Sequence, residues 1–139
     1  SITETTGRAK RRAESFGARL IVDEIGVGAG VIDSLQEQGV NAVGVNVGEA
    51  AHDKEHFANL RSELYWGLRT RFINGEIAIP DDDNLTGELT SLKFKYTNKG
   101  QIAMESKDEA EKRGVASPDL ADALCLAYAP VSVLMLSFA

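Results

Sequence analysis

The chain has 139 residues, with hydrophobic residues at 43% and charged residues at 26%, which is typical of one soluble globular domain. Its single cysteine, Cys125, excludes an intrachain disulfide and favours a reducing compartment. The net charge of −6 argues against a broad electrostatic grip on nucleic acid. The longest apolar stretch, residues 131–139, is far shorter than the roughly 20 residues that span a bilayer, so we expect no membrane association.

The first part of the chain is predicted to alternate helices and strands, as α/β proteins do. A charged segment over residues 7–16 indicates a helix, and the apolar run 18–22 indicates a buried strand that ends at Asp23. Apolar residues at helical spacing predict a second helix over residues 31–39. The valine-rich segment 40–47 is then predicted to form a strand parallel to the first.

The middle of the chain begins with a long helical pattern. Apolar residues recur every three or four positions from Phe57, which predicts an amphipathic helix that ends near Asn74. The short apolar run 77–79 is predicted to form a strand that stops at a proline. After an acidic loop, a shorter helix is predicted over residues 85–92.

The last third of the chain contains a hairpin and two helices. An Asn-Lys-Gly turn between segments 94–97 and 101–104 predicts a β-hairpin. A charged helix over 107–113 follows, and a helix over 117–128 is predicted to open with a serine N-cap and a proline in its first turn. The apolar segment 131–139 is a last buried strand or helix, or an irregular end. The predicted fold class is α/β, a sheet with helices on its faces.

Three carboxylates occupy positions where they could bind a metal ion. Asp23 falls at the C-terminal end of a strand, where open α/β sheets place their ligands. Asp119 and Asp122 are three residues apart, which puts both on one side of the last helix. If that helix packs near the end of the strand, three acidic groups converge and suit Mg²⁺. Two such ions about 4 Å apart can catalyse phosphodiester hydrolysis.

The same residues also have simpler structural explanations. Asp119 is favoured in the first turn of any helix, because the helix dipole stabilises a negative charge there. Asp23 could cap the turn that follows it. Lys107 could be a solvated surface lysine. From spacing alone, therefore, both the metal site and its structural alternatives stay open.

A glycine-rich segment suggests nucleotide binding as a competing hypothesis. Gly26, Gly28 and Gly30 follow a predicted strand and precede a helix, as in dinucleotide-binding turns. The full pattern is not met, because Val31 takes the place of the third glycine, and Asp23 would bring a negative charge near an incoming phosphate. The sequence also contains no Walker A motif.

Several further residues have a preferred structural interpretation. His52 and His56 could share a helix face as metal ligands, but such a pair is more often exposed to solvent. Tyr65 and Trp66 belong to the long helix and are interpreted as core or interface residues rather than base-stacking platforms. Cys125 lies on the apolar side of the last helix, where we expect it to be buried and inert.

Four motifs follow one another in an order that resembles a known family. They are DEIGVG at residues 23–28, NLRSE at 59–63, ESK at 105–107 and SPDLADA at 117–123. Together they resemble the C-terminal nuclease domain of phage terminase large subunits, over about residues 17–128. The first and last motifs form the most specific part of the resemblance.

The resemblance implies an RNase H-like fold, similar to that of RuvC resolvases, with a mixed central sheet and helices on both faces. It also implies hydrolysis of DNA by two Mg²⁺ or Mn²⁺ ions held by acidic residues. By position, Asp23 resembles the metal ligand of the central strand. Asp119 and Asp122 match the two aspartates of the last helix, at least one of which binds metal in the family. Lys107 resembles the family lysine that precedes this helix and acts near the scissile phosphate.

The function implied by the resemblance is a metal-dependent endonuclease that cuts concatemeric viral DNA during genome packaging, in the cytoplasm of the bacterial host. The implied partners are double-stranded DNA, the terminase ATPase domain, the small terminase subunit and the portal.

The family also carries a catalytic aspartate on strands before the first helix, and the resemblance leads us to expect that residues 1–139 lack those strands. We therefore expect residues 1–139 to form a single, N-terminally truncated nuclease domain, with a sheet edge that favours a homodimer. An inactive prophage remnant with a binding or assembly role is the alternative.

Overall fold

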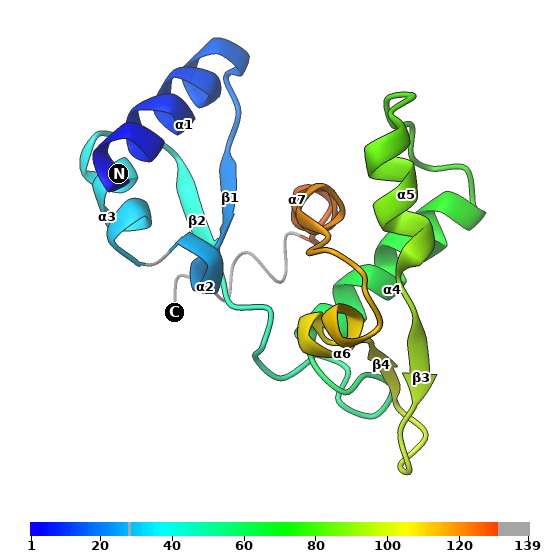
Figure 1. The fold of residues 1–139 in the computed structure, drawn as a ribbon. Helices are drawn as coiled ribbons and strands as arrows, with labels where there is room; N and C mark the ends of the chain where they lie inside the picture. Colours follow the sequence, from blue (N-terminus) through cyan, green and yellow to red (C-terminus); the bar gives the residue numbers. More distant parts are fainter. Residues whose placement is uncertain (28, 131–139) are drawn as a thin grey trace. The chain divides into compact units, whose positions relative to one another are not determined.

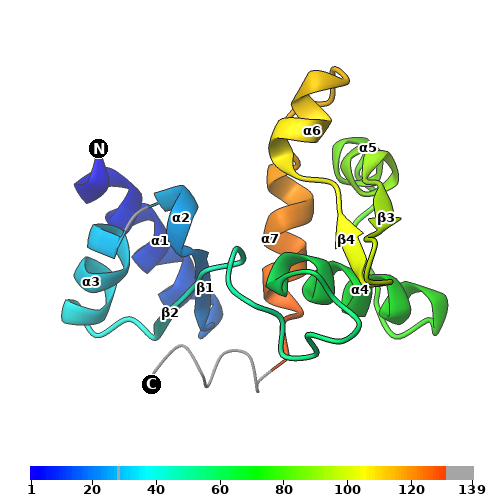
Figure 2. The same cartoon turned by 90° about the horizontal axis from the view of Figure 1, so that it is seen from below.

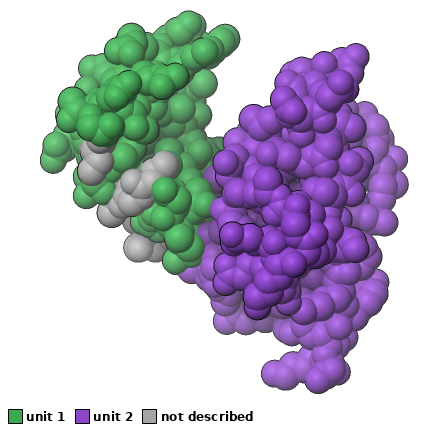
Figure 3. All heavy atoms as spheres, viewed as in Figure 1, with its two compact units in different colours: residues 1–46, 130–139 green, residues 47–129 purple. Residues whose placement is uncertain are grey.

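The computed structural model describes residues 1–27 and 29–130, so Gly28 of the glycine-rich segment and the apolar segment 131–139 lie outside the described residues. The chain divides into two compact units (Figure 3). Unit 1 contains Ser1–Asn46 and, of the described C-terminal residues, Pro130, whereas unit 2 contains Val47–Ala129. Each unit has its own helices, its own two-stranded sheet and its own buried side chains.

Unit 1 is a β-α-β arrangement preceded by a helix (Figure 1). Its described elements are α1 (Ile2–Phe16), β1 (Leu20–Asp23), α2 (Glu24–Val27), α3 (Ala29–Glu37) and β2 (Ala42–Val45). The two strands pair in parallel, in a register that places Asp23 beside Val45. The predicted parallel pairing is therefore confirmed, with α2 and α3 in the connection that parallel strands need.

The core of unit 1 lies between α1, α3 and β2. Val31 and Leu35 of α3 are four residues apart, so they share one helix face, and they form one buried cluster with Ala13 of α1. Gly44 of β2 allows α3 to approach the sheet closely, because a Cβ atom there would lie 2.6 Å from Cδ1 of Ile32. These contacts hold α3 on the sheet.

Three details predicted for unit 1 are wrong. The described residues of segment 26–30 are helical rather than a flexible turn, because Oδ1 of Asp23 accepts the backbone N–H groups of Ile25 and Gly26 at 3.0 and 3.3 Å. Such a cap satisfies amide groups that a helix start leaves open. β1 is half-buried along its length rather than buried. α1 starts earlier than predicted, since the hydroxyl of Ser1 caps its first turn.

Unit 2 combines four described helices with an antiparallel hairpin (Figure 2). Its elements are α4 (Leu60–Ile73), α5 (Asp83–Ser91), β3 (Phe94–Tyr96), β4 (Ile102–Met104), α6 (Lys107–Lys112) and α7 (Asp119–Ala127). The predicted hairpin is confirmed, and it pairs Phe94 with Met104. α7 packs against both α4 and α5, and α4 also packs against β4.

The long helix α4 is the centre of unit 2. Leu60, Leu64 and Leu68 recur every four residues and are buried. Asn59 caps the helix by accepting the backbone N–H of Ser62 at 2.9 Å. The buried hydroxyl of Ser62 also accepts the backbone N–H of Met104 at 2.9 Å, which ties α4 to β4.

Three predictions for unit 2 are also wrong in detail. Residues 77–79 form no strand, because a short apolar run that ends at Pro80 has no neighbouring strand to pair with among the described residues. α4 begins at Leu60 rather than Phe57, since the cap lies just before it. α7 begins at Asp119, with a proline in the cap position and no hydrogen bond from a capping side chain of its own.

The described strands thus form two separate sheets, a parallel pair in unit 1 and an antiparallel pair in unit 2, within an α/β architecture. Among the described residues, no helix combines the length and the apolar character that crossing a membrane requires.

Candidate functional site

The carboxylate of Asp122, in the first turn of α7, is surrounded by three donors. Its Oδ1 atom accepts hydrogen bonds from Nη1 of Arg61 at 2.8 Å and from the hydroxyl of Tyr65 at 2.5 Å. Its Oδ2 atom lies 3.0 Å from Nζ of Lys107. The Asp122 side chain is only 16% exposed, so these contacts are largely shielded from water.

Local sequence explains how the three donors reach Asp122. Arg61 and Tyr65 are four residues apart on α4, so both side chains leave the same face of that helix. The Cζ atom of Arg61 lies 4.9 Å from the centroid of the Tyr65 ring, a cation–π distance. A capping box between Ser106 and Glu109 starts α6 at Lys107, which places the lysine at the first helical residue.

The ionisation of this cluster follows from burial and hydrogen bonding. Burial by itself would raise the pKa of Asp122, but the hydrogen bonds from Tyr65 and Arg61, the charge of Arg61 and the bond from Lys107 lower it below its ordinary value. Burial, and then the bond to Asp122, raise the pKa of Tyr65 far above its ordinary value. At neutral pH the site is therefore an ionised carboxylate held by a neutral phenol and two cations.

Arg61 carries an unusual feature for a residue in this position. Its side chain is 12% exposed, and among the described residues its Nε atom is the buried side-chain polar atom that has no hydrogen-bond partner. An unmade bond of this kind costs about 1–3 kcal/mol. The guanidinium group thus stays directed at Asp122 although one of its donors is unsatisfied.

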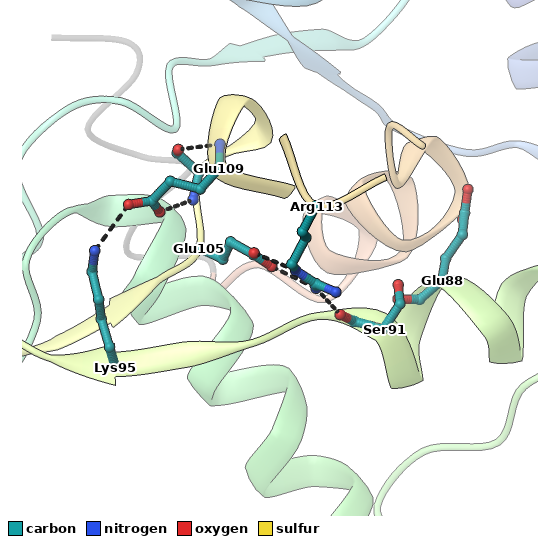
Figure 4. Close-up of polar contacts among 7 residues, drawn as sticks. Glu88, Ser91, Lys95, Glu105, Glu109 and Arg113 are labelled. Atoms are coloured by element: carbon teal, nitrogen blue, oxygen red, sulfur yellow. Dashed lines mark hydrogen bonds and ion pairs between the residues drawn. The ribbon is translucent and has the colours of Figure 1, made fainter. Parts of the chain in front are cut away.

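A second polar network holds α6, the helix that begins at Lys107 (Figure 4). Arg113 forms a two-point contact with Glu105, at 2.5 Å from Nε to Oε1 and 2.7 Å from Nη2 to Oε2. The same guanidinium donates to the carbonyl of Ser91 at 2.5 Å. Lys95 lies 2.9 Å from Glu109, so β3 is also tied to α6. This network joins the ends of α5, β4 and α6.

The start of α7 is capped by a residue from another helix. Oε2 of Glu88, on α5, accepts the backbone N–H of Ala121 at 3.0 Å. This bond satisfies an amide in the first turn, a role that helices usually fill with their own cap residue. The sequence predicted Ser117 for that role, but its hydroxyl donates to Asp119 instead. Glu88 therefore helps to set the position of the residue next to Asp122.

Of the predicted site residues, the structure brings together Lys107 and Asp122 within unit 2. Asp119 is exposed, and its Oδ1 atom accepts from Ser117 at 2.7 Å. Asp23 lies in unit 1, where it caps α2 through Oδ1. Within either unit, the described residues assemble no group of three or more His, Cys, Asp and Glu side chains that could hold a metal ion.

Sequence reasoning missed Arg61 and Tyr65 as members of this cluster. The available signal was their spacing of four residues, which places an arginine and a tyrosine on the helix face that also carries apolar core positions. Tyr65 was predicted to be a core residue, and it is buried with 6% exposure. Its hydroxyl, however, donates to a carboxylate 57 residues further along the chain, which no local pattern indicates.

The other residues singled out in the sequence have structural roles. His52 and His56 are exposed as expected, and Nδ1 of His56 lies 2.7 Å from Oδ2 of Asp53. Cys125 is buried as predicted, and burial raises the pKa of its thiol to about 12, which keeps it protonated. Trp66 packs edge-on against Phe94, with ring centroids 4.9 Å apart.

The fold defines a class of protein when it is compared with solved structures. The nuclease domain of the large terminase subunit of bacterial virus Sf6, as a lysine-to-alanine variant with manganese and β-thujaplicinol, matches with a TM-score of 0.70 and 27% identity. The match covers 91% of this chain and 72% of that domain. The predicted α/β fold of the RNase H-like class is therefore confirmed.

Within that class, the similarity is to one family, the large terminase subunits of phages. The large terminase subunit of Thermus phage G20c is 24% identical over 127 residues, which is 91% of this chain and 23% of that protein. The nuclease domain of the same phage, solved with bound magnesium, has a TM-score of 0.68 and 24% identity over 92% of this chain and 61% of that domain. No family model matches the chain. The resemblance predicted from the four motifs is confirmed.

The matches cover one part of the curated relative and both units of this chain. The chain spans about a quarter of the length of that relative, so the similarity concerns one part of a larger protein. The matched 127 residues exceed the length of either compact unit, so the similarity includes residues of both.

Proposed function

We propose that this chain acts as a metal-dependent DNA endonuclease domain of the kind found in phage large terminase subunits, cutting concatemeric viral DNA during packaging. The observation that carries the proposal is the largely buried Asp122 carboxylate, with Nζ of Lys107 3.0 Å from its Oδ2 atom. It occurs in a chain that matches a solved terminase nuclease domain over 91% of its length. The ionised carboxylate of Asp122 already pairs with the ammonium group of Lys107, so a metal ion could take the place of that ammonium group.

The donor chemistry fits Mg²⁺ or Mn²⁺, which prefer carboxylate oxygens. Oδ1 of Asp23 is used by two backbone amides, whereas its Oδ2 receives no hydrogen bond from the described residues. Oδ2 of Asp122 meets only the half-exposed ammonium group of Lys107 among those residues. We propose Asp23, Asp122 and Asp119 as metal ligands, with Asp122 the main one of the last helix. Solved terminase nuclease domains contain manganese or magnesium.

Each residue then has a defined role in hydrolysis. When bound, the two metal ions would activate water and offset the charge on the leaving oxygen. Asp122 holds negative charge at the start of α7, where Arg61 and Tyr65 orient its carboxylate. Lys107 presents its ammonium group beside that carboxylate and would bind an oxygen of the scissile phosphate.

The proposed partners follow from the same family. They are double-stranded DNA, the terminase ATPase domain, the small terminase subunit and the portal, with the bacterial cytoplasm as the place of action. We also propose that residues 1–139 work as one nuclease domain, since the similarity includes both units. A homodimer is proposed because, among the described residues, each strand of the β1–β2 pair has one open edge. Light scattering in the micromolar range tests the dimer, and a monomeric mass would contradict it.

Cleavage of supercoiled plasmid with Mn²⁺ tests the proposed activity. The chain is compared with Asp122→Asn, Asp119→Asn and Asp23→Asn, with EDTA as the metal-free control. Asp81→Asn, in an exposed loop, is the matched control for the loss of one carboxylate. We expect Asp122→Asn and Asp23→Asn to abolish cleavage, Asp119→Asn to reduce it and Asp81→Asn to leave it unchanged. Equal cleavage by all variants would reject the site.

A DNA-binding measurement separates the endonuclease from the alternative of an inactive binding protein. Fluorescence anisotropy with labelled duplex DNA and Ca²⁺ in place of Mn²⁺ reports binding alone. Binding without cleavage in Mn²⁺ would favour the binding or assembly role.

The nucleotide-binding alternative has less support, because the amides of Ile25 and Gly26 already bind the carboxylate of Asp23. A phosphate at this turn would have to displace that carboxylate. Thermal stabilisation by ATP or NAD would favour this alternative, and its absence would argue against it.

A further inference from the structure

We infer that Arg61 and Tyr65 are positioning residues that hold Oδ1 of Asp122 and thereby leave Oδ2 as the atom that binds a cation. This inference rests on the proposed function, because the cation in question is the metal ion of the nuclease site. It assigns a role to two side chains of α4 that both donate to Oδ1 rather than Oδ2.

The two oxygens of Asp122 have different kinds of partner. Oδ1 accepts from Arg61 at 2.8 Å and from Tyr65 at 2.5 Å, and both donors belong to one helix. Oδ2 meets Lys107, which belongs to α6, at 3.0 Å. Rotation of the carboxylate would break both bonds to Oδ1 at once. The orientation of Asp122 is therefore set by α4, while Oδ2 is held by a separate element.

Exposure to solvent separates the same two sets of partners. The side chains of Arg61 and Asp122 are 12% and 16% exposed, and Tyr65 is 6% exposed. Lys107 is 46% exposed, so water can replace its ammonium group at Oδ2 with little change elsewhere. Bonds shielded from water are stronger and more rigid than exposed ones. The contacts to Oδ1 are thus the more shielded ones, and the contact to Oδ2 is the one more open to exchange with solvent.

A purely structural link between α4 and α7 does not account for this arrangement. A structural link could use either carboxylate oxygen of Asp122. Arg61 and Tyr65 nevertheless both donate to Oδ1. Arg61 keeps this geometry while its Nε atom is buried without a partner among the described residues, which disfavours folding. The convergence of both α4 donors on one oxygen indicates that orientation of the carboxylate is what matters.

Removal of one hydroxyl group gives the sharpest test. Tyr65→Phe keeps the buried ring and loses the bond to Oδ1, whereas Tyr96→Phe removes the hydroxyl of a side chain on β3 that is 66% exposed. Titration calorimetry with Mn²⁺ measures the dissociation constant without any need for cleavage. We expect Tyr65→Phe to raise it about 10- to 100-fold, as loss of a group that orients a ligand does, and Tyr96→Phe to leave it unchanged.

Two arginine variants show whether charge or geometry matters at the second donor. Arg61→Lys retains the positive charge and a donor, and Arg61→Met retains similar bulk without either. We expect Arg61→Lys to weaken Mn²⁺ binding less than Arg61→Met, because a donor can still reach Oδ1. Equal and small effects of both variants would count against a role for Arg61.

A measurement without metal keeps this inference separate from the proposed function. In proton NMR, the hydroxyl of Tyr65 should give a downfield, slowly exchanging signal that Tyr65→Phe removes and Asp122→Asn shifts. If the signal is lost in Tyr65→Phe but Mn²⁺ affinity stays within twofold of the native value, the positioning role is wrong. If the native chain binds no Mn²⁺, the metal function and the cation role of Oδ2 both fail. The NMR signal then still decides whether Tyr65 holds Oδ1.

Discussion

The ammonium group of Lys107 lies 3.0 Å from Oδ2 of Asp122, which joins the first residue of α6 to the first turn of α7. The lysine is half-exposed, whereas the aspartate is 16% exposed and held by two buried donors. In this ion pair, Asp122 is therefore fixed by its other partners, whereas Lys107 can exchange with solvent or another cation. This asymmetry leads to a prediction about metal affinity.

Lys107→Ala should raise Mn²⁺ affinity and lower the rate of cleavage. Removal of the ammonium group frees Oδ2 and removes a like charge near the incoming cation. A unit charge and a divalent ion about 4 Å apart in water repel by ~2 kcal/mol. Salt and the half-exposed position of the lysine reduce this repulsion, so the expected gain in affinity is about fivefold. The loss of a cation near the scissile phosphate should slow cleavage about 100-fold at saturating Mn²⁺. Calorimetry and a plasmid assay measure the two effects.

Lys112→Ala, at the other end of α6, is the control for loss of one positive charge. It should change neither quantity by more than about twofold, since exposed charges interact weakly. Weaker Mn²⁺ binding in Lys107→Ala would show that the lysine supports the metal site rather than competes with the metal ion.

Glu88→Ala should destabilise the protein by about 0.5–2 kcal/mol, because it removes the side-chain cap from the amide of Ala121. Glu88→Gln keeps a carbonyl oxygen that can accept the same bond, so its effect should be smaller. Urea denaturation followed by circular dichroism gives both free energies of unfolding. Identical losses in the two variants would mean that the charge of Glu88, rather than its cap, matters to α7.

The Glu105–Arg113 pair should make stability depend on acid pH. The hydrogen bond from Arg113 is the main cause that holds the pKa of Glu105 below its ordinary value in the folded chain. A depressed folded-state pKa stabilises the protein above the unfolded value, about 4.3, and that contribution disappears as the pH falls through the folded value. Melting temperatures between about pH 6 and pH 2.5 should thus fall less steeply for Glu105→Gln than for the native chain.

Glu76→Gln, in an exposed segment after α4, controls for the loss of a carboxylate that has no arginine partner among the described residues. Its melting temperature should follow the native pH profile. Parallel profiles for Glu105→Gln and the native chain would show that the contact with Arg113 does not contribute to acid stability.

Two glycines of unit 2 should respond to alanine in opposite directions. Both have open space where a Cβ atom would be, but Gly67 lies inside α4 and Gly100 has a φ of 78° in the hairpin turn. Gly67→Ala should stabilise by about 0.5–1 kcal/mol, because alanine loses less backbone freedom in a helix. Gly100→Ala should destabilise by about 1–2 kcal/mol, since a side chain disfavours this left-handed conformation. Chemical denaturation measures the change in the free energy of unfolding for each variant. If both variants were stabilised, or both destabilised, the assigned backbone conformations would be contradicted.

Elements with strong local signals were predictable from the sequence. The leucine repeat of α4 and the Asn-Lys-Gly turn of the hairpin each act over a few residues, and both elements are present. The parallel pairing of β1 and β2 was also predictable from local patterns. The ordered motifs indicated the family, and two of the candidate site residues that they named, Lys107 and Asp122, lie in contact. Periodicity and turn chemistry determine such features because their energies come from residues close in sequence.

The tertiary structure alone decided how Asp122 is held. Arg61 and Tyr65 precede it by 61 and 57 residues, and Glu88 caps its helix from 33 residues before Ala121. Residues 77–79 resemble a strand locally, but a strand also requires a neighbour with free backbone groups, and the described fold supplies none. Hydrogen bonds between distant segments depend on how helices pack, and the sequence near each residue contains no record of that packing.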